Sequence, residues 1–188
     1  MSHDAMDDRR KALEEQFFQQ HDKDLVQKMK EAADKQHTKD ELHKLTGINN
    51  DALLGALADM QLGGAATLVM SLFPIVEIAW ADGSVDAKER KVILELSRTI
   101  GVEPGSPAYN YLGKWLETKP ELSWHTLWAD YVKALSAKMK PDDKAMLKAT
   151  VLGRARVVAE ASGGFMGLLF RISEAEKKVL EKLEQAFA

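Results

Sequence analysis

The sequence predicts an all-α fold, a helical bundle of two similar halves with an N-terminal helical extension. Apolar residues recur at helical spacing, glycines and prolines separate the periodic segments, and no segment shows the two-residue alternation of a strand. The length of 188 residues suits one compact domain with an appendage. Hydrophobic residues at 45% and charged residues at 29% are typical of a globular protein.

Residues 1–61 are expected to form the helical extension. A long helix is predicted over residues 8–34, where acids and bases alternate around the apolar positions Leu13, Phe17, Leu25 and Met29. Its polar face is expected to be solvated or to lie against a partner, and the helix offers a route to oligomers. Thr38 is a candidate N-cap of a short helix that ends at Gly47.

The two short helices of residues 39–61 have the outline of a DNA-binding helix-turn-helix. Asn50 or Asp51 is expected to cap the second of them. A recognition helix carries basic or amide side chains to base edges and phosphates, yet residues 51–60 contain no Lys or Arg. The net charge of −3 gives no general attraction to phosphate backbones either. We therefore expect a structural helical hairpin and no nucleic-acid partner.

Residues 62–188 are expected to form the main helical domain. Glycines and prolines delimit six predicted helices, at residues 65–81, 86–100, 107–118, 123–139, 141–161 and 173–187. Trp115, Trp124 and Trp128 are interpreted as core or helix-contact aromatics, not as a cofactor site.

Cysteine content and apolar runs indicate where the protein resides. The absence of cysteine excludes disulfides and thiolate sites and favours a reducing compartment. The N-terminal residues lack the pattern of a signal peptide. Residues 62–76 carry no charge, but Glu77 and Asp82 interrupt the apolar run before the roughly 20 residues that a membrane span needs. We expect a cytoplasmic protein in which this run forms a buried helix.

The helix after residue 85 is repeated at the end of the chain with a shift of 87 residues. Asp86 and Glu89 correspond to Ser173 and Glu176, and the apolar positions that follow also match. Each pair is the signature of a capping box, in which the first side chain accepts a hydrogen bond from the first helical turn and the Glu accepts one from the N–H of the cap. Two similar helical hairpins indicate a pseudo-symmetric bundle.

The connection before the second copy is seven residues longer, because residues 81–83 correspond to residues 161–163 at a shift of only 80. It contains Gly163, Gly164 and Gly167 with Phe165, Met166, Leu168, Leu169 and Phe170. It lacks the Lys-Ser/Thr ending of a phosphate loop. Its apolar side chains are expected to cover the core, with contact to a protein partner or peripheral association with a membrane as the alternatives.

An acidic turn at residues 81–89 is the feature with the most chemistry. Four carboxylates lie within thirteen residues, those of Glu77, Asp82, Asp86 and Glu89. Carboxylate oxygens are hard ligands suited to calcium, magnesium or manganese, so the functional interpretation is a site for one divalent cation. In the structural interpretation Asp82 stabilises the turn, Gly83 takes a positive φ, and the other two acids form the capping box. The spacing is not that of an EF-hand, and it favours the structural interpretation.

Other polar residues suggest less. The five histidines, at positions 3, 21, 37, 43 and 125, show no metal-binding spacing and are interpreted as solvated side chains. Paired carboxylates can perform acid-base chemistry, but this requires a substrate pocket and separated pKa values. A metal-assisted hydrolase that uses the same carboxylates is therefore an alternative function.

The acidic turn and its repeat resemble the TerB-like family associated with tellurite resistance. The resemblance is carried by Ile78-Ala79-Trp80-Ala81-Asp82-Gly83-Ser84-Val85-Asp86-Ala87-Lys88-Glu89, and by Val158-Ala159-Glu160-Ala161-Ser162-Gly163 with Ile172-Ser173-Glu174-Ala175-Glu176. The family pairs an Ala-Asp-Gly turn in each half with a downstream acidic residue. The resemblance covers residues 62–188 and is more specific in the first half than in the second.

The resemblance implies a bundle of two similar halves, a group of acidic residues as a metal site, and a role in sensing or scaffolding stress responses near the membrane. The candidate ligands are Asp82, Asp86, Glu89 and Glu176, with Glu77 and Glu160 nearby in the sequence. Ser162 and Ser173 depart from the family pattern. We expect a non-enzymatic interaction or scaffold domain that holds one divalent cation and binds a protein partner. The alternatives are the hydrolase and a helical assembly module without metal.

Overall fold

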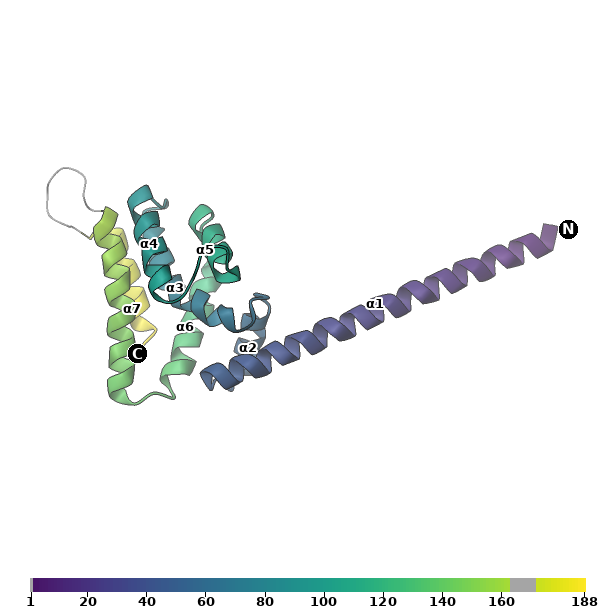
Figure 1. Ribbon diagram of the computed structural model, residues 1–188, viewed down its shortest axis with the longest axis horizontal. Helices are drawn as coiled ribbons and strands as arrows, with labels where there is room; N and C mark the ends of the chain where they lie inside the picture. Colours follow the sequence, from purple (N-terminus) through teal and green to yellow (C-terminus); the bar gives the residue numbers. More distant parts are fainter. Residues whose placement is uncertain (1, 163–171) are drawn as a thin grey trace. The chain divides into compact units, whose positions relative to one another are not determined.

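The computed structural model describes the backbone of residues 2–162 and 172–188 and the side chains of residues 20–161 and 172–188. Over these residues the protein has eight α-helices, one 3-10 turn and no strand, which confirms the all-α prediction (Figure 1). The chain divides into two units, Met1–Thr38 and Lys39–Ala188. The predictions for the glycines and apolar residues of the segment 163–171 lie outside the described residues.

Helix α1 (Ser2–Thr46) is longer than the helix predicted over residues 8–34. It continues through Thr38, so the predicted N-cap at that residue is wrong. Residues 35–38 contain neither glycine nor proline, and extending an existing helix avoids the cost of a new nucleus. The predicted stop at Gly47 is confirmed, because Gly47 has a φ of +69° and its N–H bonds to the carbonyl of His43 at 2.8 Å.

The unit Lys39–Ala188 begins well before residue 62, the predicted start of the main domain. Its core includes Leu42, Ile48 and Leu57, which are at most 1% exposed. Helix α2 (Asp51–Ala58) is capped by Asn50, as predicted, since Asn50 Oδ1 accepts a hydrogen bond from Leu53 N at 3.1 Å. The last turns of α1 and all of α2 are therefore parts of the bundle.

Helix α3 is the central helix of this unit. After the turn η1 (Gly63–Ala65), α3 (Ala66–Ala79) packs against five other helices: α4 (Ala87–Thr99), α5 (Pro107–Glu117), α6 (Leu122–Ser136), α7 (Pro141–Ser162) and α8 (Glu174–Gln185). The six helices predicted for this region are all present, with ends shifted by at most three residues. Other helices cover α3 on most sides, because 10 of its 14 residues are buried, including Pro74 in its interior.

The apolar run of α3 is explained by this burial, as predicted. Among the helices that the structure describes, no single one is long and apolar enough to cross a membrane. The pair Asp51–Ala58 and Gly63–Ala79, bent by 104°, reaches that length and composition only together.

Aromatic side chains fill the space between α3, α5 and α6. The rings of Phe73 and Trp115 pack edge-to-face at 5.6 Å, and those of Trp115 and Trp124 at 5.0 Å. Trp80 Nε1 donates a hydrogen bond to the carbonyl of Trp115 at 2.8 Å. Trp128 is 1% exposed. The interpretation of the three predicted tryptophans as core or helix-contact residues is confirmed.

Candidate functional site

The acidic turn joins α3 to α4 and is closed by its own hydrogen bonds. Asp82 Oδ1 accepts a hydrogen bond from Ser84 N at 3.0 Å, which is the pattern of an Asx turn. Gly83 has a φ of +99°, a conformation that side chains with a Cβ rarely adopt. The structural roles predicted for Asp82 and Gly83 are confirmed.

A capping box begins each of α4 and α8, as the sequence repeat predicts. In the first, Asp86 Oδ1 accepts a hydrogen bond from Glu89 N at 2.8 Å, and Glu89 Oε2 accepts one from Asp86 N at 2.8 Å. In the second, Ser173 Oγ accepts from Glu176 N at 3.2 Å, and Glu176 Oε2 accepts from Ser173 N at 2.5 Å. In each box the Glu folds back over its own helix start.

Glu89 and Glu176 are buried carboxyls, 4% and 5% exposed. Burial is the largest influence on Glu89 and raises its pKa from 4.5 to about 7; the hydrogen bond from Asp86 N opposes the rise, while the charges of Asp86, Asp82 and Glu176 add to it. Glu89 is therefore about half protonated at neutral pH. A protonated carboxyl is a poor cation ligand, so a cation that used Glu89 would compete with a proton.

Glu77 makes its contacts away from the other acids of the turn. From α3 its carboxylate reaches His125 Nδ1 of α6 at 2.8 Å and Lys182 Nζ of α8 at 3.1 Å. The side chains of Glu77 and His125 are each 16% exposed. The interpretation of His125 as a solvated histidine is wrong, because its ring also packs near Phe73 and Trp128, with centroids 6.4 and 6.0 Å away.

The six candidate ligands are not all brought together in one place. Asp82, Asp86 and Glu176 lie close enough to Glu89 to affect its charge. The carboxylate of Glu77 contacts His125 of α6 and Lys182 of α8, and Glu160 is exposed on α7. Within the part of the chain that the structure describes, no three His, Asp or Glu side chains are arranged to hold a metal ion. A divalent cation at this turn stays a prediction.

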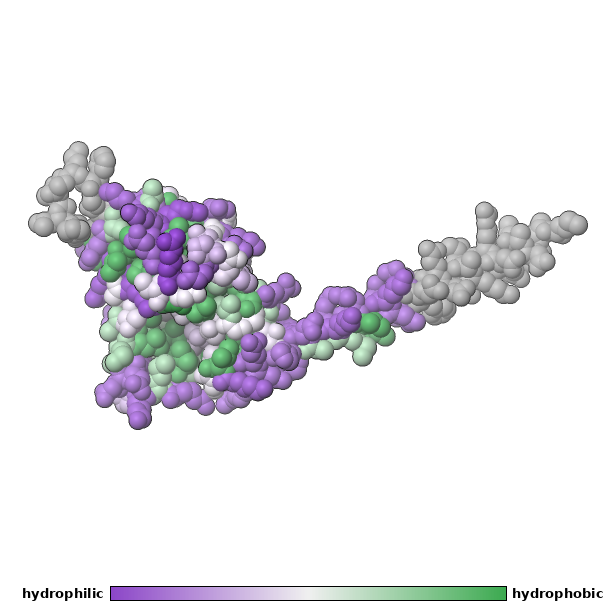
Figure 2. Space-filling model, in the orientation of Figure 1, coloured by the Kyte–Doolittle hydropathy of each residue, from purple (hydrophilic) through white to green (hydrophobic). Residues whose placement is uncertain are grey.

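Helix α1 carries a second candidate site, a group of exposed apolar side chains. Leu25, Val26 and Met29 are 51%, 56% and 65% exposed. Leu25 and Met29 are four residues apart and lie on one side of the helix. Figure 2 shows a small hydrophobic area on the otherwise hydrophilic described part of this helix. The surrounding charges are balanced, with four lysines and four acidic residues in residues 20–38.

The chain matches no family model, no curated protein and no solved structure. The resemblance to the TerB-like family stays a prediction.

Proposed function

We propose that this chain is a non-enzymatic interaction module whose N-terminal helix pairs with a second copy of itself. The observation that supports the proposal is that residues 2–38 are helical and leave Leu25, Val26 and Met29 at least 51% exposed. Most of the stability of a helix in a protein comes from packing its apolar side against another element. A partner helix supplies that packing.

The charge pattern favours a second copy over other partners. Equal numbers of acids and bases in residues 20–38 leave no net repulsion between two identical helices. Nucleic acid and anionic membranes would both call for a basic face, which this stretch lacks. Leu25, Met29 and Ala32 follow the four- and three-residue steps of a coiled-coil seam.

The test is the mass of the full chain in solution, measured by sedimentation equilibrium over a wide range of concentrations. The wild type is expected to dimerise, and the double variant Leu25→Gln with Met29→Gln to be monomeric. Four apolar side chains per dimer are changed, so at about 1 kcal/mol each the dimer weakens by roughly a thousandfold. Gln keeps the charge and the helix propensity of the segment.

The matched control is Met146→Gln, because Met146 is also exposed, at 70%, but lies on α7. It is expected to leave the dimer intact. A wild type that stays monomeric at every concentration, or a double variant that dimerises as the wild type does, contradicts the proposal.

We also propose one divalent cation at the acidic turn, supported by the electrostatic proximity of Asp82, Asp86 and Glu176 to Glu89 and by the TerB-like resemblance. The proposed stress-related role rests on that resemblance alone. Calorimetry with calcium, magnesium and manganese tests the site: heat that disappears in Asp82→Asn and persists in the exposed control Asp130→Asn supports it. Absence of heat with all three cations refutes it. Among the described residues, the contacts given for these carboxylates do not support the hydrolase alternative.

A further inference from the structure

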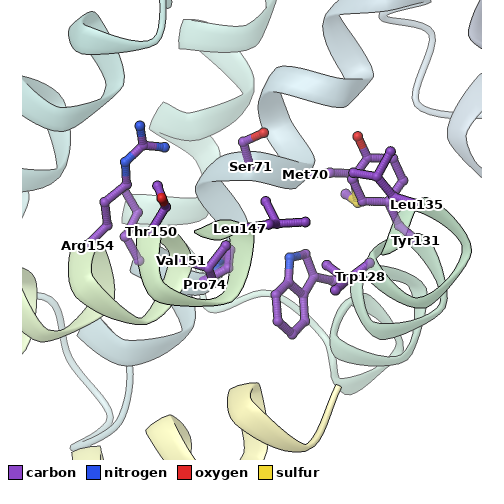
Figure 3. A pocket seen from close by; sticks show the side chains of 12 residues that line it. Met70, Ser71, Pro74, Trp128, Tyr131, Leu135, Leu147, Thr150, Val151 and Arg154 are labelled. Atoms are coloured by element: carbon purple, nitrogen blue, oxygen red, sulfur yellow. The ribbon is translucent and has the colours of Figure 1, made fainter. Parts of the chain in front are cut away.

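A small cavity lies between α3, α6 and α7, and no residue of the acidic turn lines it (Figure 3). Its volume is about 80 Å³. Met70, Ile75 and Trp128 form walls that are at most 1% exposed, and Leu147 and Val151 of α7 close another side. Figure 2 shows hydrophobic residues gathered on the face of the bundle between α6 and α7. The cavity is thus an apolar space with an opening to the surface.

Trp128 brings a hydrogen-bond donor to this apolar space. Its indole nitrogen points toward the middle of the group of side chains in Figure 3. No described residue accepts a hydrogen bond from Trp128 Nε1. No described side-chain nitrogen is both fully buried and unpaired, so this atom keeps some accessible surface. Because Trp128 lines the cavity, we place that accessible surface at the cavity. Trp128 is only 1% exposed, and leaving a buried N–H without an acceptor costs free energy. A guest molecule with an acceptor oxygen in the cavity would remove that cost.

Arg154 adds a positive charge at the edge of the same cavity. It lies on α7 one turn after Thr150, and both line the cavity (Figure 3). Arg154 is half-buried and forms no ion pair with any described side chain. A guanidinium is a planar donor that suits a carboxylate with two parallel hydrogen bonds. Burial also raises the pKa of Tyr131 in the cavity wall, so its hydroxyl stays neutral and does not repel an anion.

We propose that this cavity binds a small organic carboxylate, with its apolar body between α3, α6 and α7 and its carboxylate on Arg154. An acceptor oxygen on the body receives the hydrogen bond of Trp128 Nε1. A cavity of about 150 Å³ holds one benzene molecule, so this one, at about 80 Å³, encloses only the last few atoms of a short alkyl chain, and the rest of the guest lies in its opening beside Arg154. This binding site goes beyond the proposed pairing of α1 and does not depend on it.

The experiment uses the full chain labelled with nitrogen-15 and follows the indole N–H signals of the four tryptophans by NMR. Trp128→Phe identifies the signal of Trp128. The probes are 5-oxohexanoate, which has a carboxylate, an alkyl body and a carbonyl acceptor, and three relatives. Hexanoate lacks the carbonyl acceptor, 5-oxohexanamide lacks the carboxylate, and acetate lacks both the alkyl body and the carbonyl acceptor. Saturable movement of the Trp128 signal is expected with 5-oxohexanoate, weaker binding with hexanoate and with the amide, and no movement with acetate.

The variant Arg154→Gln tests the ion pair, with Arg156→Gln as the matched control because Arg156 is exposed on the same helix. Loss of the charged hydrogen bonds is expected to weaken 5-oxohexanoate binding about tenfold or more, while the control binds as the wild type does. Thermal unfolding verifies that both variants are folded. A Trp128 signal that does not move at millimolar 5-oxohexanoate overturns the proposal. Equal binding of the acid and the amide, or equal binding by the two arginine variants, also overturns it.

Discussion

Replacing Glu89 with Gln is expected to stabilise the bundle more at alkaline pH than at acidic pH. Glu89 has its pKa raised from 4.5 to about 7, so between these values the folded chain holds a proton that the unfolded chain releases. Stability therefore falls as the pH rises through this window, and the full cost is present above about pH 7. At about 1.36 kcal/mol per pKa unit, the cost is about 3 kcal/mol. Gln has no ionised form, so the variant lacks this loss of stability at alkaline pH.

The capping box makes this substitution a clean one. The carbonyl oxygen of Gln can still accept the hydrogen bond from Asp86 N, and Asp86 can still accept from the N–H of residue 89. The assay is urea unfolding of both proteins between about pH 4.5 and 9. Subtracting the two free energies of unfolding cancels the titration of every group that they share. The control is Glu95→Gln, an exposed position on the same helix.

The expected difference curve rises in favour of the variant by up to about 3 kcal/mol as the pH passes from about 4.5 to 8. The curve of the Glu95 control is expected to lack this rise. A flat curve for Glu89→Gln refutes the reasoning. So does an NMR titration in which the Glu89 carboxyl has its midpoint near the ordinary value of 4.5.

Three further substitutions test the turn, the second cap and the interhelical contact, each by urea unfolding. Gly83→Ala is expected to lower the free energy of unfolding by about 1 kcal/mol or more, because Ala rarely adopts the positive φ of this position. The control Gly113→Ala lies in a helix with open space around a new Cβ, so it is expected to raise the free energy of unfolding. Equal effects of the two substitutions would contradict this reasoning. Ser173→Ala should cost about 1 kcal/mol and Ser173→Asp little, and a harmless Ala would argue against the second capping box. Glu77→Ala should cost about 1–3 kcal/mol, because it leaves the half-buried His125 and Lys182 without their partner; no loss would mean that the contact is unimportant.

Local signals explain why so much of the fold could be predicted. Asp86, Ser173 and Asn50 are side chains whose preference for helix starts acts within one turn, and each caps the helix expected of it. Gly47 ends a helix by its own backbone freedom. Thr38 has the same capping chemistry, but nothing around it interrupts α1, so the continuing helix wins. The twofold relation between the halves remains a prediction.

The candidate site was less predictable, because its geometry depends on residues far apart in the chain. Glu77 is close to Asp82 in sequence, yet its partners are 48 and 105 residues away. A sequence pattern gives no information on which side of α3 the bundle places this carboxylate. The repeat did bring Glu89 and Glu176 into correspondence, and the charge of Glu176 is among the influences that raise the pKa of Glu89.

Pro74 in the middle of α3 has a consequence for the cavity. Proline has no N–H, so the carbonyl oxygen of Met70, one turn earlier, cannot receive its usual helical hydrogen bond. Met70 and Pro74 both line the cavity. The helix turn that forms this apolar wall therefore has one backbone hydrogen bond fewer than a regular turn of α3. This wall of the cavity is therefore the part of α3 that the helix's own hydrogen bonds hold least tightly.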